Sequence, residues 1–382
     1  MTYDVIVAGL GGMGSAAAFH LARRGARVLG LERFDIGHSL GSSHGLTRII
    51  RLAYHEGAHY VPLLRRAYEN WREAERLFGE RLLFVTGSID AGPEGSRVVQ
   101  GALRSCVAHD LPHEVLDPGE LARRFPGYAL PAGFQAVYQP DGGFVASERA
   151  IIAHITLAQA AGAELHARER VLGWEPVGEG VRVRTERASY AARRLIFAAG
   201  AWVGQFVPAL AGQAVPERQV LGWFQPAEPA LFEPPRFPVF NLIGADGHWY
   251  GTPVWGMPGV KIGRYHHRHQ TIDPDDRVRG CDAEDEAVLR TCLRRYFPKA
   301  DGPVLRLAAC IFTNLPDGHF VIDRLPGLPQ VVVASPCSGH GYKFCSVVGE
   351  ILTDLALQGG SRFDLEPFRL ERDRLRQNCQ KG

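Results

Sequence analysis

Residues 3–33 read YDVIVAGLGGMGSAAAFHLARRGARVLGLER, and this stretch decides the fold. The apolar run Val5–Ala8 is typical of a buried parallel strand. A glycine-rich turn follows, then a helix expected over 13–24 that ends at Gly25. A second strand comes next, so the order strand, turn, helix, strand predicts the first unit of a nucleotide-binding sheet.

The glycine turn has the GxGxxG spacing at Gly9, Gly11 and Gly14. Gly9 permits the tight turn, Gly11 lets a pyrophosphate approach the backbone, and Gly14 lets the helix pack on the strand. Glu32, after the second strand, is placed to accept hydrogen bonds from an adenosine ribose. A chance glycine turn would lack this acid and these flanking elements. The motif predicts a dinucleotide site without choosing between FAD and NAD.

Two further apolar strands lie far downstream, RRLIFAAGAW at 193–202 and VVVAS at 331–335. Residues 219–275 instead alternate apolar and polar residues, as antiparallel strands do. We therefore expect an α/β protein with a Rossmann-like parallel-sheet domain, discontinuous in sequence, and an α+β domain built on an antiparallel sheet. The expected boundaries are 1–82, 145–215 and 321–382 for the nucleotide-binding domain, and 83–144 and 216–320 for the second, substrate-binding domain.

The composition argues against several classes of protein. A chain of 382 residues with 46% hydrophobic and 22% charged residues is globular. No apolar run is long enough to span a bilayer, and no leader precedes the first strand, so we expect a cytoplasmic protein. The net charge of +2 and dispersed arginines exclude nucleic acid as an expected partner. Seven cysteines without a CxxC pair predict reduced thiols and no metal site.

Lysine is rare in this chain, which has four among 43 basic residues. They are Lys261, Lys299, Lys343 and Lys381. Wherever the chain needs only a cation it uses arginine, so a lysine hints at a site that needs a compact ammonium with an adjustable pKa. Cys310, in the strand-like LRLAACIFT, is by itself read either as a small buried hydrophobe or as a reactive thiol.

Four motifs together resemble the flavin-dependent amine oxidases typified by monomeric sarcosine oxidase, N-methyltryptophan oxidase and L-pipecolate oxidase. The motifs are GLGGMG with Glu32, GSSHGLTRIIRLAYHEG (41–57), YGTPVWGMPGVKIGRYHH (250–267), and CIFTNLPDGHFVID (310–323) followed by SGHGYKF (338–344). The resemblance runs over nearly the whole chain. It implies FAD as the cofactor of the nucleotide-binding domain.

The resemblance gives Cys310 and Lys261 chemical roles. In the family, the cysteine matching Cys310 forms a thioether with the 8-methyl group of the flavin, which is reasonable for a thiolate and an electrophilic methide. The lysine matching Lys261 lies by the hydride-accepting nitrogen and helps dioxygen take electrons. A solvated lysine at a strand edge is the alternative for Lys261.

The resemblance also assigns a carboxylate site. The residue matching Arg48 lies over the flavin, and the one matching Arg51 pairs with the substrate carboxylate, for which a guanidinium is well suited. Arg48 and Arg51 would share one face if this stretch were helical. Lys343 opens a predicted helix, where a cation is unfavourable unless an anion is near. We expect that anion to be the substrate carboxylate, with an exposed first-turn lysine as the alternative.

Other pocket positions follow from the same motifs. Tyr250 and His266 match catalytic pocket residues, although the chain around 264–269 is one residue longer than the pattern, which leaves His266, His267 and His269 as alternatives. Phe312 replaces a tyrosine and predicts a more apolar substrate wall. The expected cofactor contacts are Gly9, Gly11, Gly12, Met13, Gly14, Glu32, Ser42, His44, Thr47, Arg48, Val171, Gly200, Cys310, Gly339, Gly341 and Lys343.

The resemblance implies an FAD-dependent oxidase of secondary amino acids, either N-methylated or cyclic. It would oxidise the carbon–nitrogen bond to an imine and reduce dioxygen to hydrogen peroxide, acting as a monomer on a small molecule. A dehydrogenase with another electron acceptor and a flavin-binding protein without catalysis are the alternatives. A nicotinamide enzyme is disfavoured because it would leave Cys310 without a role.

Overall fold

The computed structural model describes residues 2–276 and 280–372. Its first large sheet has a parallel centre with the strand order β9, β2, β1, β12 and β19. These strands span Glu164–His166, Val28–Leu31, Tyr3–Ala8, Ser189–Phe197 and Leu328–Ser335. Three antiparallel strands extend this centre: β10 (Val171–Val177), β11 (Gly180–Thr185) and β18 (Val321–Leu325). Strand segments far apart in the sequence thus form one sheet, as expected.

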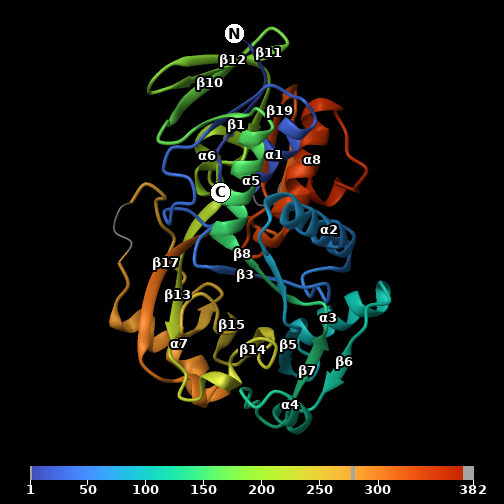
Figure 1. The fold of residues 1–382 in the computed structure, drawn as a ribbon, viewed down its shortest axis with the longest axis vertical. Helices are drawn as coiled ribbons and strands as arrows, with labels where there is room; N and C mark the ends of the chain where they lie inside the picture. Colours follow the sequence, from blue (N-terminus) through green and yellow to red (C-terminus); the bar gives the residue numbers. More distant parts are fainter. Residues whose placement is uncertain (1, 277–279, 373–382) are drawn as a thin grey trace.

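Four helices pack together beside this sheet (Figure 1). They are α1 (Gly12–Arg23), α2 (Val61–Phe78), α5 (Ser147–Ala160) and α8 (Cys345–Leu357). Helix α1 contacts α8 closely, because a Cβ added at Gly349 would lie 2.5 Å from the Ala16 carbonyl carbon. The short helix α6 (Val203–Phe206) follows β12 of this sheet in the sequence. Helix α1 begins one residue before the predicted start and ends one residue before the predicted end.

The second large sheet has the strand order β17, β13, β16, β15, β14, β5, β7 and β6. In this order the strands span Val304–Asn314, Val215–Phe224, Val260–Arg264, Gly247–Thr252, Val239–Gly244, Ser88–Pro93, Phe134–Gln139 and Glu114–Leu116. Only β5 and β14 pair in parallel. The associated helices are α3 (Arg97–Ala108), α4 (Pro118–Arg124) and α7 (Ala283–Tyr296). Helix α7 buries Leu289 and Leu293 in the apolar core of this half.

A small third sheet contains β3 (Thr47–Ile50), β8 (Gly143–Ala146) and β4 (Leu83–Val85). Arg48 and Arg51 would share one face only if this stretch were helical, and it is a strand instead. The segment Thr-Arg-Ile-Ile is rich in β-branched residues and pairs antiparallel with β8, so Arg48 lies in a strand and Arg51 directly follows it.

Single turns of 3-10 helix complete the structure at Ala58–Tyr60, Gly200–Trp202, Pro208–Leu210, Pro229–Leu231, Pro298–Ala300, Tyr342–Phe344 and Glu366–Phe368. Lys343 lies in one of them, two residues before α8, and not in the first turn of that helix. Within the described ranges, no helix is long and apolar enough to cross a membrane. Cys379 and Lys381 lie outside the described residues.

The expected fold class is confirmed: a parallel sheet with a nucleotide-binding turn and a largely antiparallel second sheet. We propose that the two sheets form the cores of the two predicted domains.

Candidate active site

One large cavity is lined by residues of both large sheets. At one end lie the carboxyl ends of β1 and β2 with the glycine turn, represented by Gly9 and Glu32. At the other end, strands of the second sheet contribute Tyr250, Lys261 and Cys310. Ligands of open α/β sheets bind at the carboxyl ends of the strands, which is where this cavity begins.

The glycine turn is closely packed against its neighbours. Gly9 has φ +96°, and a Cβ added there would lie 2.5 Å from the Ala198 carbonyl oxygen. A Cβ at Gly14 would lie 1.7 Å from the Gly9 carbonyl oxygen, so only glycine lets α1 approach β1 this closely. At Gly11 the nearest atom to an added Cβ is the Ser43 Oγ at 3.7 Å, which leaves room for a ligand to approach the backbone.

Glu32 is a buried carboxylate held at the end of β2. Its Oε2 accepts a hydrogen bond from the Leu10 N–H at 2.9 Å, and its Oε1 accepts one from the Phe34 N–H at 3.0 Å. Burial raises the pKa of Glu32, but His38 and these two N–H groups outweigh that effect and lower it. The ionised carboxylate is therefore fixed at the place where a ribose would lie.

Cys310 lies on β17 and is 4% exposed. Arg48 places its Nη2 3.6 Å from the Cys310 sulfur and also donates to the Ser42 carbonyl at 2.7 Å. Burial raises the pKa of Cys310, but His44 and Arg48 together lower it to about 6. The lowered pKa favours the thiolate, which is the nucleophilic form of cysteine.

Lys261, on β16, is buried in the cavity wall. Its Nζ donates to the Thr47 carbonyl at 2.5 Å and lies 3.2 Å from the Thr47 Oγ1. Burial and the nearby Arg48 charge lower the pKa of Lys261 well below its usual value. The alternative of a solvated lysine at a strand edge is therefore excluded by its burial.

Arg51 is 1% exposed and is surrounded by carboxylates. Its Nη2 donates to Glu56 Oε2 at 2.8 Å, and its Nε lies 3.2 Å from Asp90 Oδ1. Burial would raise the pKa of Glu56, but Arg51 and His55 hold it well below its usual value. The sequence reasoning missed both acids. Glu56 lies within the motif at 41–57, whereas nothing in the sequence connects Asp90, on β5, to Arg51.

Lys343 approaches the same cluster from the turn before α8. Its Nζ donates to the His340 carbonyl at 2.8 Å and to the Tyr54 hydroxyl at 3.5 Å. Burial and the Arg51 charge lower the pKa of Lys343 to about 7, although Glu56 raises it in part. Lys343 is 5% exposed, so it is not the exposed lysine that was the alternative.

Three aromatic side chains, Tyr250, Tyr265 and Phe312, line the cavity, and Tyr250 packs in the same cluster as Cys310. The Tyr265 ring makes edge contacts with Tyr250 at 5.2 Å and with Phe312 at 5.7 Å between centroids. Phe312 also lies over Gly339, where an added Cβ would be 2.7 Å from its ring. Tyr265 was missed in the sequence, because a histidine was expected at this place.

His266 does not line the cavity, contrary to the expectation for this position. Its side chain is 49% exposed, and its Nδ1 is 2.7 Å from Glu217 Oε2. Side chains alternate between faces along an extended chain, so Tyr265 continues the face of Lys261 and His266 turns away. His267, bonded to Asp285, and His269 also lie outside the lining.

Most other predicted cofactor contacts are brought together. The lining includes Gly11, Gly12, Met13, Ser42, Thr47, Val171, Gly200, Gly339 and Gly341. Two are not in the lining. Gly14 lies in the helix–strand contact, and His44 lies behind Cys310 with its Nε2 lacking a hydrogen-bond partner among the described residues.

The arrangement fits FAD. An extended dinucleotide needs a phosphate-binding turn at one end and a wider space for its ring system at the other. The cavity continues from Gly11 and Glu32 to Lys261 and Cys310, and therefore offers both.

Comparisons with known proteins agree with this reading. The model of the family described as FAD dependent oxidoreductase (DAO) matches residues 4–355. Monomeric sarcosine oxidase of Streptomyces avermitilis is 44% identical over 363 residues, which cover 94% of this chain and 94% of that protein. N-methyl-L-tryptophan oxidase of Salmonella dublin is 37% identical over 374 residues, covering 97% and 99%.

A solved structure shares the fold as well. The open form of NikD, described as an unusual amino acid oxidase essential for nikkomycin biosynthesis, is similar with a TM-score of 0.83 and 26% identity. The match covers 96% of this chain and 97% of NikD. The chain is an FAD-dependent oxidoreductase and belongs to the family that contains monomeric sarcosine oxidase and N-methyl-L-tryptophan oxidase.

Proposed function

We propose that this enzyme oxidises secondary amino acids, N-methylated or cyclic, and reduces dioxygen to hydrogen peroxide. The observation that carries the proposal is the end of the cavity where Arg51, Lys261, Cys310 and Lys343 all line one space. FAD, which the glycine turn, Glu32 and Cys310 would hold, would supply two-electron oxidation of the substrate carbon–nitrogen bond with dioxygen as the final acceptor, and water would hydrolyse the resulting imine.

Arg51 and Lys343 hold the substrate carboxylate in this proposal. Arg51 already pairs with Glu56 and Asp90, so an incoming carboxylate competes with Glu56, whose side chain is 14% exposed. The Lys343 ammonium supplies the additional positive charge. Because its pKa is about 7, carboxylate binding favours the protonated form and draws in a proton at alkaline pH.

Arg48 and Lys261 act on charge near the flavin ring. Arg48 lies by the Cys310 sulfur, and Lys261 is fixed by Thr47, so neither cation must reorganise when negative charge develops. A fixed cation in a buried site lowers the barrier to electron transfer onto dioxygen. Tyr250 is proposed to line the space beside the reacting carbon.

Cys310 is proposed to hold the flavin covalently through a thioether to its 8-methyl group. The lowered pKa of Cys310 and its place in the cavity lining support this assignment. On a denaturing gel, flavin fluorescence should stay with the protein band and disappear in Cys310→Ala. Cys337→Ala and Cys345→Ala are matched controls and should keep it. A wild-type band that loses its flavin on denaturation contradicts the link.

The amine is proposed to be larger than sarcosine. Phe312, Tyr265 and Tyr250 form an aromatic wall, and against its rings a bulkier substrate gains roughly 0.8 kcal/mol per buried methylene. Proline, pipecolate and N-methyl derivatives of hydrophobic amino acids fit such a wall.

A panel of amines scored by peroxide release in air tests the function. We expect peroxide with cyclic or N-methyl amino acids and little with the corresponding primary amino acids or with amines that lack the carboxylate. No peroxide with any secondary amino acid would contradict the proposal.

We also propose a cytoplasmic monomer. Six cysteines in the described part of the chain are unpaired, which suits a reducing compartment. Exposed large apolar side chains such as Leu77, Val107 and Leu172 come from separate elements, α2, α3 and β10. Light scattering of the purified enzyme measures the oligomeric state directly.

A further inference from the structure

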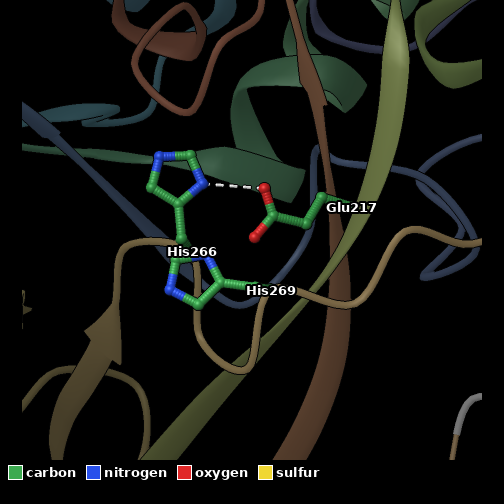
Figure 2. Close-up of side chains that lie close together, drawn as sticks. All are labelled: Glu217, His266 and His269. Carbon is green, nitrogen blue, oxygen red and sulfur yellow. Dashed lines mark hydrogen bonds and ion pairs between the residues drawn. The ribbon is translucent and has the colours of Figure 1, made fainter.

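Three side chains that commonly bind metal ions lie together outside the cavity. Glu217 belongs to β13, and His266 and His269 lie in the turn after β16. One potential ligand atom from each residue lies within 4.8 Å of the others. Figure 2 shows both imidazole rings on the same side of the carboxylate. The sequence gives no sign of this cluster, because Glu217 and His266 are 49 residues apart.

The carboxylate of Glu217 is buried and only half satisfied. Glu217 is 7% exposed, and its Oε2 accepts hydrogen bonds from His266 and Asn314. Its Oε1 is buried and has no hydrogen bond of good geometry among the described residues, although the Gln219 side chain lies close enough to help lower the Glu217 pKa. An unsatisfied buried oxygen that carries charge is costly, so this atom marks a position where a cation would be stabilised.

The backbone conformation and the exposure of His266 and His269 allow both rings to bind a metal ion. His266 and His269 have φ values of +54° and +53°, and this tight turn brings their rings nearly parallel, 5.7 Å apart with an angle of 6°. Both residues are exposed, so an ion can reach them and the rings can rotate. The neighbouring Arg268 is paired with Asp282 at 2.9 Å and with Asp285, which reduces its repulsion of a cation.

We propose that Glu217, His266 and His269 bind a divalent transition-metal ion of the zinc type. Two imidazoles and a carboxylate form a donor set that Zn²⁺ prefers, with water in the remaining position. Ligands about 2.1 Å from a tetrahedral zinc ion lie roughly 3.4 Å from one another, so the exposed rings close inward by a small rotation. The ion takes no part in electron transfer.

The position of the site connects it to the wall of the cavity. Glu217 pairs directly with Phe312 across β13 and β17, and directly opposed residues in antiparallel strands share a face of the sheet. Tyr265, which contacts Phe312, directly precedes His266. A bound ion therefore links β13 to the turn that carries Tyr265 and fixes one side of the aromatic wall.

Equilibrium dialysis of the untagged, flavin-loaded enzyme against Zn²⁺, after treatment with a chelator, tests the proposal. We expect one zinc ion per chain in the wild type and at least about tenfold weaker binding in His269→Ala and Glu217→Gln. His113→Ala, which removes a histidine far from the cluster, is the matched control and should bind as the wild type does. Cys281→Ala controls for zinc binding by a thiol.

A second measurement is the thermal midpoint. Zinc should raise it in the wild type and in His113→Ala but not in His269→Ala, because an ion that binds only the folded state stabilises it. If Glu217→Gln fails to fold, His269→Ala decides alone, since its exposed side chain makes little contribution to packing. No stoichiometric zinc in the wild type, or equal binding in His269→Ala, would overturn the proposal.

Discussion

The two ends of the cavity are built in different ways. The nucleotide end consists of backbone brought close by missing side chains, at Gly9 and Gly14, together with one carboxylate, Glu32. The reactive end consists of buried charged side chains, with Lys261 held by Thr47 and Arg51 held by two acids. The nucleotide end holds a ligand by its close-packed backbone. At the reactive end, the pKa of Lys343 is about 7, so its charge can change near neutral pH.

The difference explains which substitutions each end can tolerate. At Gly9 and Gly14 an added methyl group collides with backbone, which cannot move without separating helix and strand. At Lys261 a neutral side chain of similar size still packs and leaves no buried acid unpaired, so the loss falls on chemistry. Stability should therefore report on the first end and kinetics on the second.

The largest expected effect is that of Gly14→Ala. Its Cβ would lie 1.7 Å from the Gly9 carbonyl oxygen, so we expect a loss of several kcal/mol of unfolding free energy and failure to retain flavin. Gly11→Ala is the matched control, since its Cβ meets only the Ser43 Oγ at 3.7 Å; it should fold and lose flavin affinity alone. Thermal unfolding and flavin content measure both effects. Equal midpoints for the two variants would contradict this account of the turn.

Lys261→Met should come next in size. It removes the buried ammonium and keeps much of the side-chain volume, so reoxidation by dioxygen should slow about 10²- to 10³-fold while reduction by substrate changes far less. Stopped-flow absorbance separates the two half-reactions. The role assigned to Lys261 would be wrong if both half-reactions slowed equally.

The pH dependence of carboxylate binding tests Lys343. Because its pKa is about 7, it is protonated below that pH and neutral above it. An anion prefers the protonated form, so the inhibition constant of a short aliphatic carboxylate should be constant below pH 7 and rise above it, by up to about tenfold per pH unit.

Using a carboxylate inhibitor avoids titration of the substrate amine. Lys343→Met should bind the inhibitor more weakly at pH 6 and show no rise above pH 7. A wild-type inhibition constant that does not change between pH 6 and 9 would show that Lys343 does not contact the anion.

The smallest expected effect concerns substrate preference. Phe312→Tyr restores a hydroxyl to the aromatic wall, and we expect the ratio of kcat/KM for proline or pipecolate over sarcosine to fall by a few fold. The ratio, measured by peroxide release, cancels differences in the amount of active enzyme. If sarcosine is the best wild-type substrate, or if the ratio is unchanged in Phe312→Tyr, then Phe312 does not determine the substrate preference.

The sequence predicted the nucleotide end well because its determinants are local. Gly9, Gly14 and Glu32 lie within one stretch whose periodicity and turn residues specify strand, helix and strand. The parallel sheet followed from three apolar runs with the same character. The charged partners at the other end were harder to foresee, because Asp90 reaches Arg51 only through the pairing of the second sheet.

Two local features depend on the backbone conformation. Arg48 and Arg51 would share a face only if their segment were helical, whereas its β-branched residues pair with β8. His266 was expected in the cavity from motif matching, but the continuation of the β16 alternation places Tyr265 there instead. In both cases the backbone conformation, and not the residue type, decides which way a side chain points.

The central claim is that the cavity oxidises a secondary amino acid and delivers the electrons to dioxygen. The most direct test mixes the purified enzyme with N-methyl or cyclic amino acids without oxygen and then admits air, while flavin absorbance and peroxide are recorded. The account predicts that the flavin bleaches, then regains its absorbance in air with one peroxide formed per amine oxidised. Absorbance that never bleaches would leave a flavin-binding protein without catalysis, and bleached flavin that air does not restore would indicate a dehydrogenase with another acceptor.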